Sequence, residues 1–337
     1  RVGPVDRWAR WARPPAPTVG GRFGPVEEAL TPAQQEVVDL LGCPPEDRPR
    51  FEPALRHELR DRLEDGLADL LVDPDLDRDP LWVSKYRLRE VHGCEAKFVA
   101  EDHGFTPSAA TARGTVAHKA IELTISLPDE TPPLELVDEA ISRLSDAEAW
   151  LSDWLRECSD IDRAELRGEV NELLVKFQDC WPPLRPQWRP APESRLYADL
   201  ADGRVTLAGK VDLALGRADG DRAGKVLVDL KTGRPSPTHR EDLRFYALIE
   251  AIRVGVPPRT LATHYLDSGT LSVEDVTVDL LESATARTID GVRRMAELRD
   301  PDRPLTKRPG PPCHWCSLAD GCTEGQAWLT EERPDLD

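Results

Sequence analysis

The chain has 337 residues, of which 39% are hydrophobic and 31% charged, a composition typical of a globular protein and not of a disordered or membrane-embedded one. This length allows one large domain or two ordinary ones, and no apolar run approaches the roughly 20 residues that cross a bilayer. The net charge of −18 argues against a protein that coats nucleic acid through a broad cationic surface, although a local groove of arginines remains compatible with it.

The seven cysteines and the start of the sequence bear on the compartment. No positively charged stretch followed by an apolar one opens the chain, so we expect a cytoplasmic location. In a reducing compartment, cysteines serve as thiols or metal ligands more often than as disulfides. We therefore look for metal-ligand spacing among them.

The N-terminal part, residues 1–80, is the least informative. Residues 1–30 are rich in Pro, Gly and Arg, and we expect an irregular arm anchored by Trp8 and Trp11. Two helices are predicted after it, one capped by Thr31 and one over Pro53–Leu71 with leucines at helical spacing. The acidic, turn-rich stretch before residue 81 makes a boundary.

Helices are also predicted between residues 81 and 190. Ser84 can cap a helix that runs toward Cys94 and continues beyond it, and Ser108 opens another over 108–125. On this second helix His118 and Glu122 lie four residues apart and share a face. Two or three further helices are predicted over residues 133–180, and we interpret the segment 131–190 as a helical insertion or cap.

Strand-forming residues dominate from position 191. A strand over Ser194–Leu200 follows Glu193, and two more runs flank the turn sequence ADGDRAG as a predicted hairpin. Further elements alternate up to residue 300, so we expect an α/β core over 191–300. The predicted elements are strands Val205–Leu215, Lys225–Leu230, Leu261–Asp267 and Leu271–Asp279, and helices Asp242–Val254 and Leu281–Leu298.

The predicted hairpin carries three residues that can act together. Asp229 and Lys231 project to the same face of a strand, because side chains alternate with period 2. If the two strands pair, Asp212 lies beside Asp229, and two carboxylates at one point favour a hard cation such as Mg²⁺ or Mn²⁺. A metal beside a lysine suits phosphodiester hydrolysis. On these residues alone, solvated charges on an edge hairpin are the alternative.

The C-terminal segment, residues 301–337, holds Cys313, Cys316 and Cys322 in the pattern C-x₂-C-x₅-C. Three clustered thiols favour a soft metal, and Cys94 is the candidate fourth ligand, far upstream in the segment 81–130. The alternatives are a zinc ribbon that uses His314 or Cys94, and thiols that are simply buried.

Together, the sequences G-K-V-D and D-L-K of the hairpin and the four cysteines resemble the PD-(D/E)XK nuclease superfamily, in its iron–sulfur RecB-like subgroup. The subgroup includes the AddB and AdnB nuclease domains and CRISPR-associated RecB-like exonucleases. The resemblance covers about residues 81–330 and implies a central mixed sheet flanked by helices. It also implies a [4Fe–4S] cluster on Cys94, Cys313, Cys316 and Cys322, which would join the N- and C-terminal parts as a staple.

The resemblance assigns further roles by position. It implies that His118, Asp212, Asp229 and the Leu230 carbonyl hold Mn²⁺ or Mg²⁺, with Lys231 as the catalytic lysine. Tyr246 matches the tyrosine of the family's Q-x-x-x-Y helix, whereas the glutamine of that motif is replaced here by Asp242. Glu193 is a further candidate metal ligand, and a solvated strand-edge glutamate is the alternative for it.

The function implied is that of a metal-dependent DNA nuclease, an exonuclease on single-stranded DNA in repair, recombination or defence. A helical cap over 131–190 would narrow the cleft to one strand, and a helicase or repair complex is a possible partner. The alternative is a non-catalytic DNA-binding or adaptor subunit of a helicase–nuclease complex, with an architectural cluster. An adaptor has no need of Lys231, so the complete set of Asp212, Asp229 and Lys231 favours the nuclease.

Overall fold

The computed structural model describes residues 30–101, 107–128 and 130–331. The predicted arm with Trp8 and Trp11 lies outside these residues. None of the described helices is both long and apolar enough to cross a membrane.

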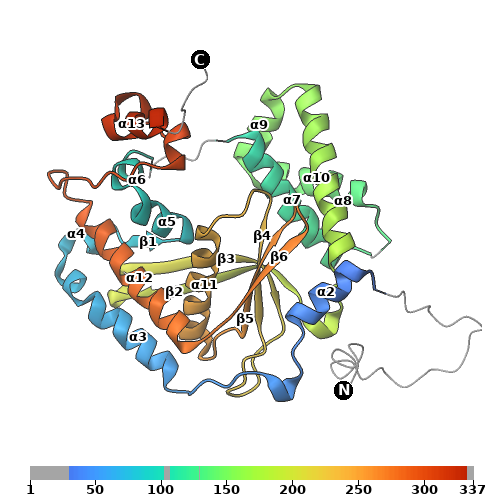
Figure 1. Ribbon diagram of the computed structural model, residues 1–337, viewed down its shortest axis with the longest axis horizontal. Coiled ribbons are helices and arrows are strands. Elements are labelled where there is room, and N and C mark those ends of the chain that lie inside the picture. Colours follow the sequence, from blue (N-terminus) through green and yellow to red (C-terminus); the bar gives the residue numbers. More distant parts are fainter. Residues whose placement is uncertain (1–29, 102–106, 129, 332–337) are drawn as a thin grey trace, which may run out of the picture.

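A mixed sheet of six strands forms the centre of the described chain (Figure 1). Its strand order is β1-β3-β4-β5-β6, and β2 pairs with β3 as well. The pairs β1–β3 and β4–β5 are parallel, and the other three are antiparallel. The strands are β1 Leu81–Val83, β2 Ala191–Leu200, β3 Val205–Leu215, β4 Val226–Lys231, β5 Thr260–Tyr265 and β6 Thr270–Asp275.

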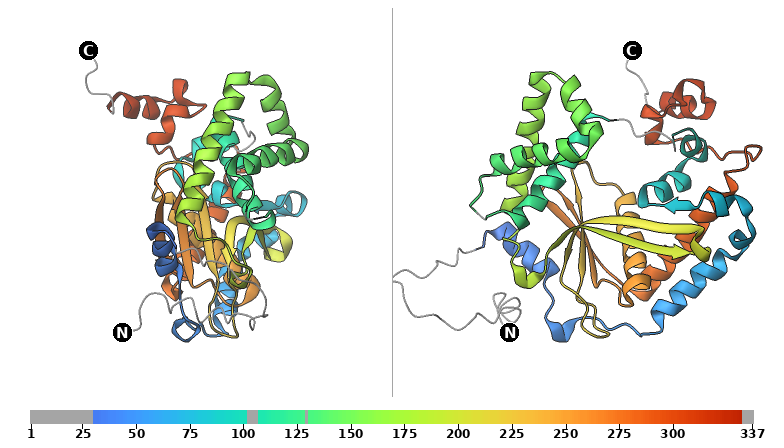
Figure 2. Two further views of the ribbon diagram at one scale, coloured as in Figure 1. Left: turned by 90° about the vertical axis from the view of Figure 1, so that its right-hand side faces the viewer. Right: turned by 180° about the vertical axis from the view of Figure 1, so that it is seen from behind.

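Helices pack on both sides of this sheet and form two apolar cores (Figures 1 and 2). One core lies under α3 (Leu55–Gly66), α5 (Lys85–Gly93), α11 (Thr238–Val254) and α12 (Val278–Glu297). The other lies under α2 (Pro32–Leu41), α7 (Ala109–Ser126), α8 (Pro133–Ala147), α9 (Ala149–Glu157) and α10 (Asp160–Cys180). The α/β class and the mixed sheet flanked by helices are therefore confirmed.

Three predicted helix caps are present. The side chains of Thr31, Ser84 and Ser108 each accept a hydrogen bond from the backbone N–H three residues further on. Such bonds satisfy donors that the first turn of a helix otherwise leaves unpaired. The cap at Ser84 fixes where α5 begins, and the cap at Ser108 fixes α7, so both matter for the side chains described below.

Several predicted boundaries were wrong. β1 was not predicted, because a three-residue strand shows no period, and the helix over Pro53–Leu71 is α3 followed by the 3₁₀ turn Ala68–Val72. The helix through Cys94 is interrupted there, giving α5 and then α6 (Glu95–Glu101). The strand predicted over Leu271–Asp279 ends at Asp275, because Thr277 caps α12. α4 (Pro74–Arg78) occupies the predicted boundary.

The C-terminal segment is attached to α6 by a buried carboxylate. Glu95, with 2% of its surface exposed, accepts hydrogen bonds from Arg303 and from the Thr306 backbone N–H, and its own N–H donates to the Thr306 carbonyl. Two 3₁₀ turns and α13 (Thr323–Glu331) follow, beside α6 in Figure 1. Glu95 therefore holds this segment next to Cys94.

Candidate functional site

The site lies where β3 and β4 part. The strands pair as predicted, but the described register ends at Leu213 opposite Val228, just before Asp212 and Asp229. Leu230, past this point, uses its backbone N–H to donate to Asp212 Oδ2 at 2.7 Å. The separation of the strands thus leaves room for side chains between them, and both aspartates are buried.

His118 reaches this point from α7. Its Nε2 lies 3.0 Å from the Leu230 carbonyl oxygen, and its Nδ1 lies 3.3 Å from Asp212 Oδ1. Burial by itself lowers the pKa of His118, but the Asp212 carboxylate outweighs it and the net shift is upward. In turn, burial would raise the pKa of Asp212, whereas His118 holds it well below its usual range.

Glu193 completes a compact group with His118 and Asp212. One ligand atom from each of the three lies within 4.8 Å of the others. Glu193 stands opposite Asp212 between two register pairs of β2 and β3, and its φ of 51° is left-handed, a strained conformation for a non-glycine residue. Its carboxylate also pairs with Lys210. The sequence offered no signal for this backbone conformation.

Asp229 contacts two ammonium groups. Lys85 Nζ donates to its Oδ1 at 2.8 Å, and Lys231 Nζ lies 2.7 Å from its Oδ2. That second contact lacks hydrogen-bond geometry, so Oδ2 is a buried oxygen without a hydrogen bond. Burial lowers the pKa of Lys85, but Asp229 outweighs this and raises it well above its usual value. Sequence analysis missed Lys85, whose only signal was its place after the cap residue Ser84.

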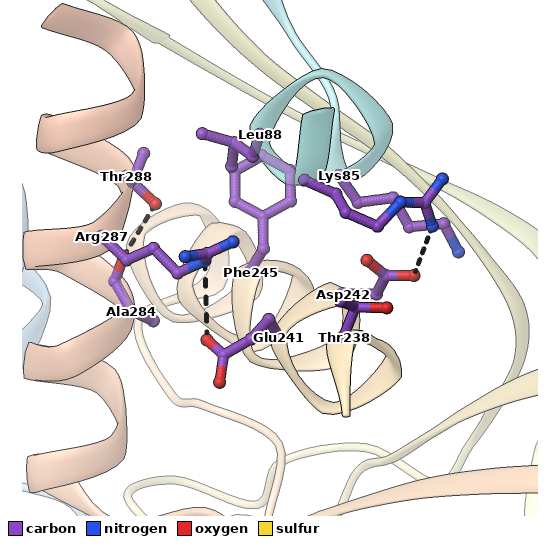
Figure 3. Close-up of a pocket in the computed structure, with 10 residues that line it drawn as sticks. Lys85, Leu88, Thr238, Glu241, Asp242, Phe245, Ala284, Arg287 and Thr288 are labelled. Carbon is purple, nitrogen blue, oxygen red and sulfur yellow. Dashed lines mark hydrogen bonds and ion pairs between the residues drawn. The ribbon is translucent and has the colours of Figure 1, made fainter. Parts of the chain in front are cut away.

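Asp242 lies in the second turn of α11, which begins at Thr238 and not at Asp242 as predicted. Its side chain is 2% exposed, and its Oδ2 lies 3.4 Å from Lys231 Nζ and 3.9 Å from Arg89 Nη1. Figure 3 shows it at a small pocket between α5, α11 and α12, beside Lys85. Asp242 therefore serves as a second carboxylate for Lys231, not as a helix cap.

Tyr246 lies one turn further along α11 and packs under the site. A Cβ atom at Gly209 would lie 2.3 Å from the Tyr246 ring, so only glycine fits there. Lys85 Nζ stands 5.0 Å from the ring centroid, a cation–π distance. The glycine of G-K-V-D thus admits the ring that supports Lys85.

A cleft of about 710 Å³ opens from this site between α7, α8 and the sheet. Its cationic side chains come from both walls: Lys119 and Arg143 from the helices, and Arg195, Lys210, Lys231 and Arg234 from the sheet and the loop after β4. The same lining holds Glu122, Glu148 and Glu193, so the six cations are in excess, which favours an anionic ligand on a chain of net charge −18.

The four cysteines with metal-ligand spacing line one cavity of their own. Cys94 directly follows α5, Cys313 lies in the first of the two 3₁₀ turns, and Cys316 and Cys322 each directly follow one of these turns. The sulfur atom of Cys313 accepts a hydrogen bond from the Gly310 N–H, and that of Cys322 from the Gly325 N–H. A Cβ at Gly325 would approach Cys322 Sγ to 3.3 Å. All seven cysteines, each within the described residues, are free of disulfides.

Comparison with known proteins places the chain in a family. The family model of the PD-(D/E)XK nuclease superfamily matches residues 83–323, well over half of the sequence. The chain belongs to the PD-(D/E)XK nuclease superfamily. The matched range includes His118, the hairpin and the four cysteines. No curated protein matched the sequence.

Two solved structures are similar to this member of the superfamily. A crystal structure from Eubacterium rectale, described as a candidate exonuclease, shows 10% identity and a TM-score of 0.46, and covers 74% of this chain and 90% of its own. The structure of SSO0001 shows 14% identity and a TM-score of 0.31, with coverage of 64% and 97%.

Proposed function

We propose that this chain is a metal-dependent deoxyribonuclease of the iron–sulfur RecB-like subgroup, which acts as an exonuclease on single-stranded DNA. The observation that supports it best is the meeting of His118, Glu193 and Asp212 beside Asp229 and Lys231, at the end of a cationic cleft. Superfamily membership supports the same chemistry.

The donor set fits a hard divalent cation. Carboxylate and carbonyl oxygens suit Mg²⁺ and Mn²⁺, and imidazole is compatible with Mn²⁺. His118, Asp212, Glu193 and the Leu230 carbonyl would hold it, and Asp229 would contribute Oδ2, which here is ion-paired with Lys231 and has no hydrogen bond. When bound, such a cation supplies an activated water and a Lewis acid for the scissile phosphate.

The protein's own residues then orient the reaction. Lys231, held between Asp229 and Asp242, lines the cleft, where its ammonium would orient the attacking water and stabilise negative charge on the phosphate. Lys85 would fix the rotamer of Asp229 from the other side. Tyr246 would support Lys85 from below.

The four cysteines that line one cavity are the observation that favours a [4Fe–4S] cluster. Four thiols lining one cavity are the donor set of such a cluster, and the two backbone N–H groups directed at sulfur atoms would stabilise thiolates. The cluster would join α5 to the C-terminal segment. Iron and acid-labile sulfide in freshly purified protein test this, and one stoichiometric zinc without iron would refute it.

The catalytic proposal is tested by digestion of 5′- and 3′-labelled single strands with and without Mn²⁺. We expect stepwise shortening from one end only with Mn²⁺, and loss of both cleavage and Mn²⁺ binding in Asp212→Asn. A wild-type protein that binds the strand and Mn²⁺ yet never cleaves would favour the adaptor function instead.

A further inference from the structure

One part of the sheet has an open face. Along β2, Leu196, Ala198 and Leu200 are buried against the core, and the alternate residues point away from it. In the view from behind, the β2–β3 hairpin faces the viewer with α11 and α12 behind it, and no described helix crosses its outer half (Figure 2). This face is therefore open to solvent among the described residues.

The order of side chains on this face follows from the strand register. Glu193 and Asp212 stand at the candidate metal site, Arg195 pairs with Lys210 next to them, and Tyr197 pairs with Ala208 after that. Because a strand rises about 3.4 Å per residue, Tyr197 lies roughly 14 Å along the strand from Glu193. The open face thus begins at the metal site and leads away from it.

Two large aromatic side chains are exposed at the far end of this row. Trp82, on β1, is 51% exposed and Tyr197 is 43% exposed, and their ring centroids are 5.7 Å apart at an interplanar angle of 57°. Ala208, the register partner of Tyr197, is small and buried, so the two rings project beyond it from the sheet. Exposed aromatic pairs on an open surface indicate a binding site, since solvation of their apolar faces is unfavourable.

Of the two cations between these rings and the metal site, Arg195 is unpaired in the described part of the chain and Lys210 is held by a carboxylate. Arg195 has no hydrogen-bond or carboxylate partner among the described residues, whereas Lys210 pairs with Glu193. Both line the cleft that contains His118 and Lys231. Asp199, the next residue on this face of β2 after Tyr197, carries a negative charge and accepts a hydrogen bond from Thr206. The cationic side chains therefore lie only on the metal-site side of the two rings.

We propose that Trp82, Tyr197, Arg195 and Lys210, here called the aromatic strip, form the track on which a single strand lies as it enters the site. Bases stack on the two rings, and the two cations contact the phosphates nearer the metal site. This inference rests on the proposed nuclease function. It favours a single strand over a duplex, because paired bases stack on each other and cannot offer their faces to protein rings.

The test separates stacking from charge. Binding is measured by fluorescence anisotropy in the Lys231→Ala variant with Mn²⁺, using labelled oligothymidylate, an abasic strand of equal length, and a duplex. We expect Trp82→Leu and Tyr197→Leu each to weaken oligothymidylate binding roughly 5- to 150-fold and to leave the abasic strand unaffected. Trp82→Phe and Tyr197→Phe retain a ring and should bind nearly as the parent does.

Two further variants complete the design. Arg195→Ala should weaken the binding of both single strands alike. It should also reduce the slope of log K against log[salt] by the amount expected for about one phosphate contact. Ile161→Ala removes an apolar side chain that is 70% exposed elsewhere, on α10, and should change nothing.

The outcomes distinguish the two proposals. If wild-type protein cleaves single strands but the two leucine variants bind oligothymidylate as the parent does, the aromatic strip is refuted and the nuclease stands. Tighter binding of the duplex than of the single strand by the parent would also refute it. If wild-type protein neither binds nor cleaves any of the three probes, the proposed function itself fails.

Discussion

Replacing Lys85 with methionine tests how the buried Asp229 is neutralised. Methionine keeps most of the length and apolar surface of the side chain but removes the ammonium that donates to Asp229 at 2.8 Å. At an effective dielectric constant of about 20, two unit charges at that separation attract by about 6 kcal/mol before desolvation is counted. Breaking a buried pair by removing one partner costs about 3–5 kcal/mol.

Two features of the structure reduce the expected cost of removing the Lys85 ammonium. Lys231 remains 2.7 Å from Asp229, and the Lys85 side chain is 24% exposed, so solvent screens part of the interaction. We therefore expect Lys85→Met to lower the free energy of unfolding by about 1–3 kcal/mol in metal-free protein. With saturating Mn²⁺ the loss should shrink, because a cation bound by Asp229 replaces the missing charge.

Urea unfolding in EDTA and in Mn²⁺ measures the loss in free energy of unfolding without and with the metal. Lys176→Met is the matched control, since Lys176 is an exposed lysine whose one hydrogen bond within the described residues goes to the Asp267 carbonyl. It should change stability by less than about 0.5 kcal/mol. Equal losses for Lys85→Met with and without Mn²⁺ would refute the idea that Asp229 shares its charge between Lys85 and the metal.

Three further predictions concern the support of the two sites. Gly209→Ala should lower the free energy of unfolding by about 1–3 kcal/mol, because the added methyl group clashes with Tyr246. Gly168→Ala is the control: it has open space around it in α10 and should raise the free energy of unfolding. Urea unfolding of both variants measures the two changes. Burial raises the pKa of Glu95, but hydrogen bonds from Arg303 and Thr306 outweigh burial and hold the pKa below its ordinary value of 4.5. The contribution of Glu95 to the free energy of unfolding is therefore present above pH 4.5 and is lost as the pH falls through the lowered pKa. The stability gap between wild type and Glu95→Gln should accordingly narrow below pH 4.5, and a gap that widens there would contradict this. Cys94→Ala should abolish iron binding and the brown colour of the protein, as measured by absorbance and iron analysis, and undiminished iron content would exclude Cys94 as a ligand.

Much of the fold could be predicted from local patterns. The hairpin of β3 and β4 is marked by strand-forming residues on both sides of a turn, and helices α2, α5 and α7 by hydroxyl caps. Patterns fail where the signal is short or mixed: β1 has only three residues, and valines on both sides of Thr277 concealed the boundary between β6 and α12. The prolines before Thr238 favoured a loop, although one of them stands at the start of α11.

The part of the candidate site that could be predicted consists of residues in sequence motifs. The residues His118, Asp212, Asp229 and Lys231 stand in recognisable motifs, and the structure pairs His118 with Asp212 and Asp229 with Lys231. Lys85 and the inward turn of Glu193 depend on tertiary geometry: a cap that starts α5 beside β4, and a left-handed residue within a strand. Neither leaves a periodic or compositional trace in the sequence.

The most direct test of the central claim is the single-turnover cleavage rate of Lys231→Ala on a labelled single strand at saturating Mn²⁺. Lys231 is placed to stabilise charge on the phosphate and is not among the proposed metal ligands, so Mn²⁺ binding should persist while the rate falls by a factor of about 10² or more. A variant that binds Mn²⁺ and cleaves within about tenfold of the wild-type rate would contradict the account of this site.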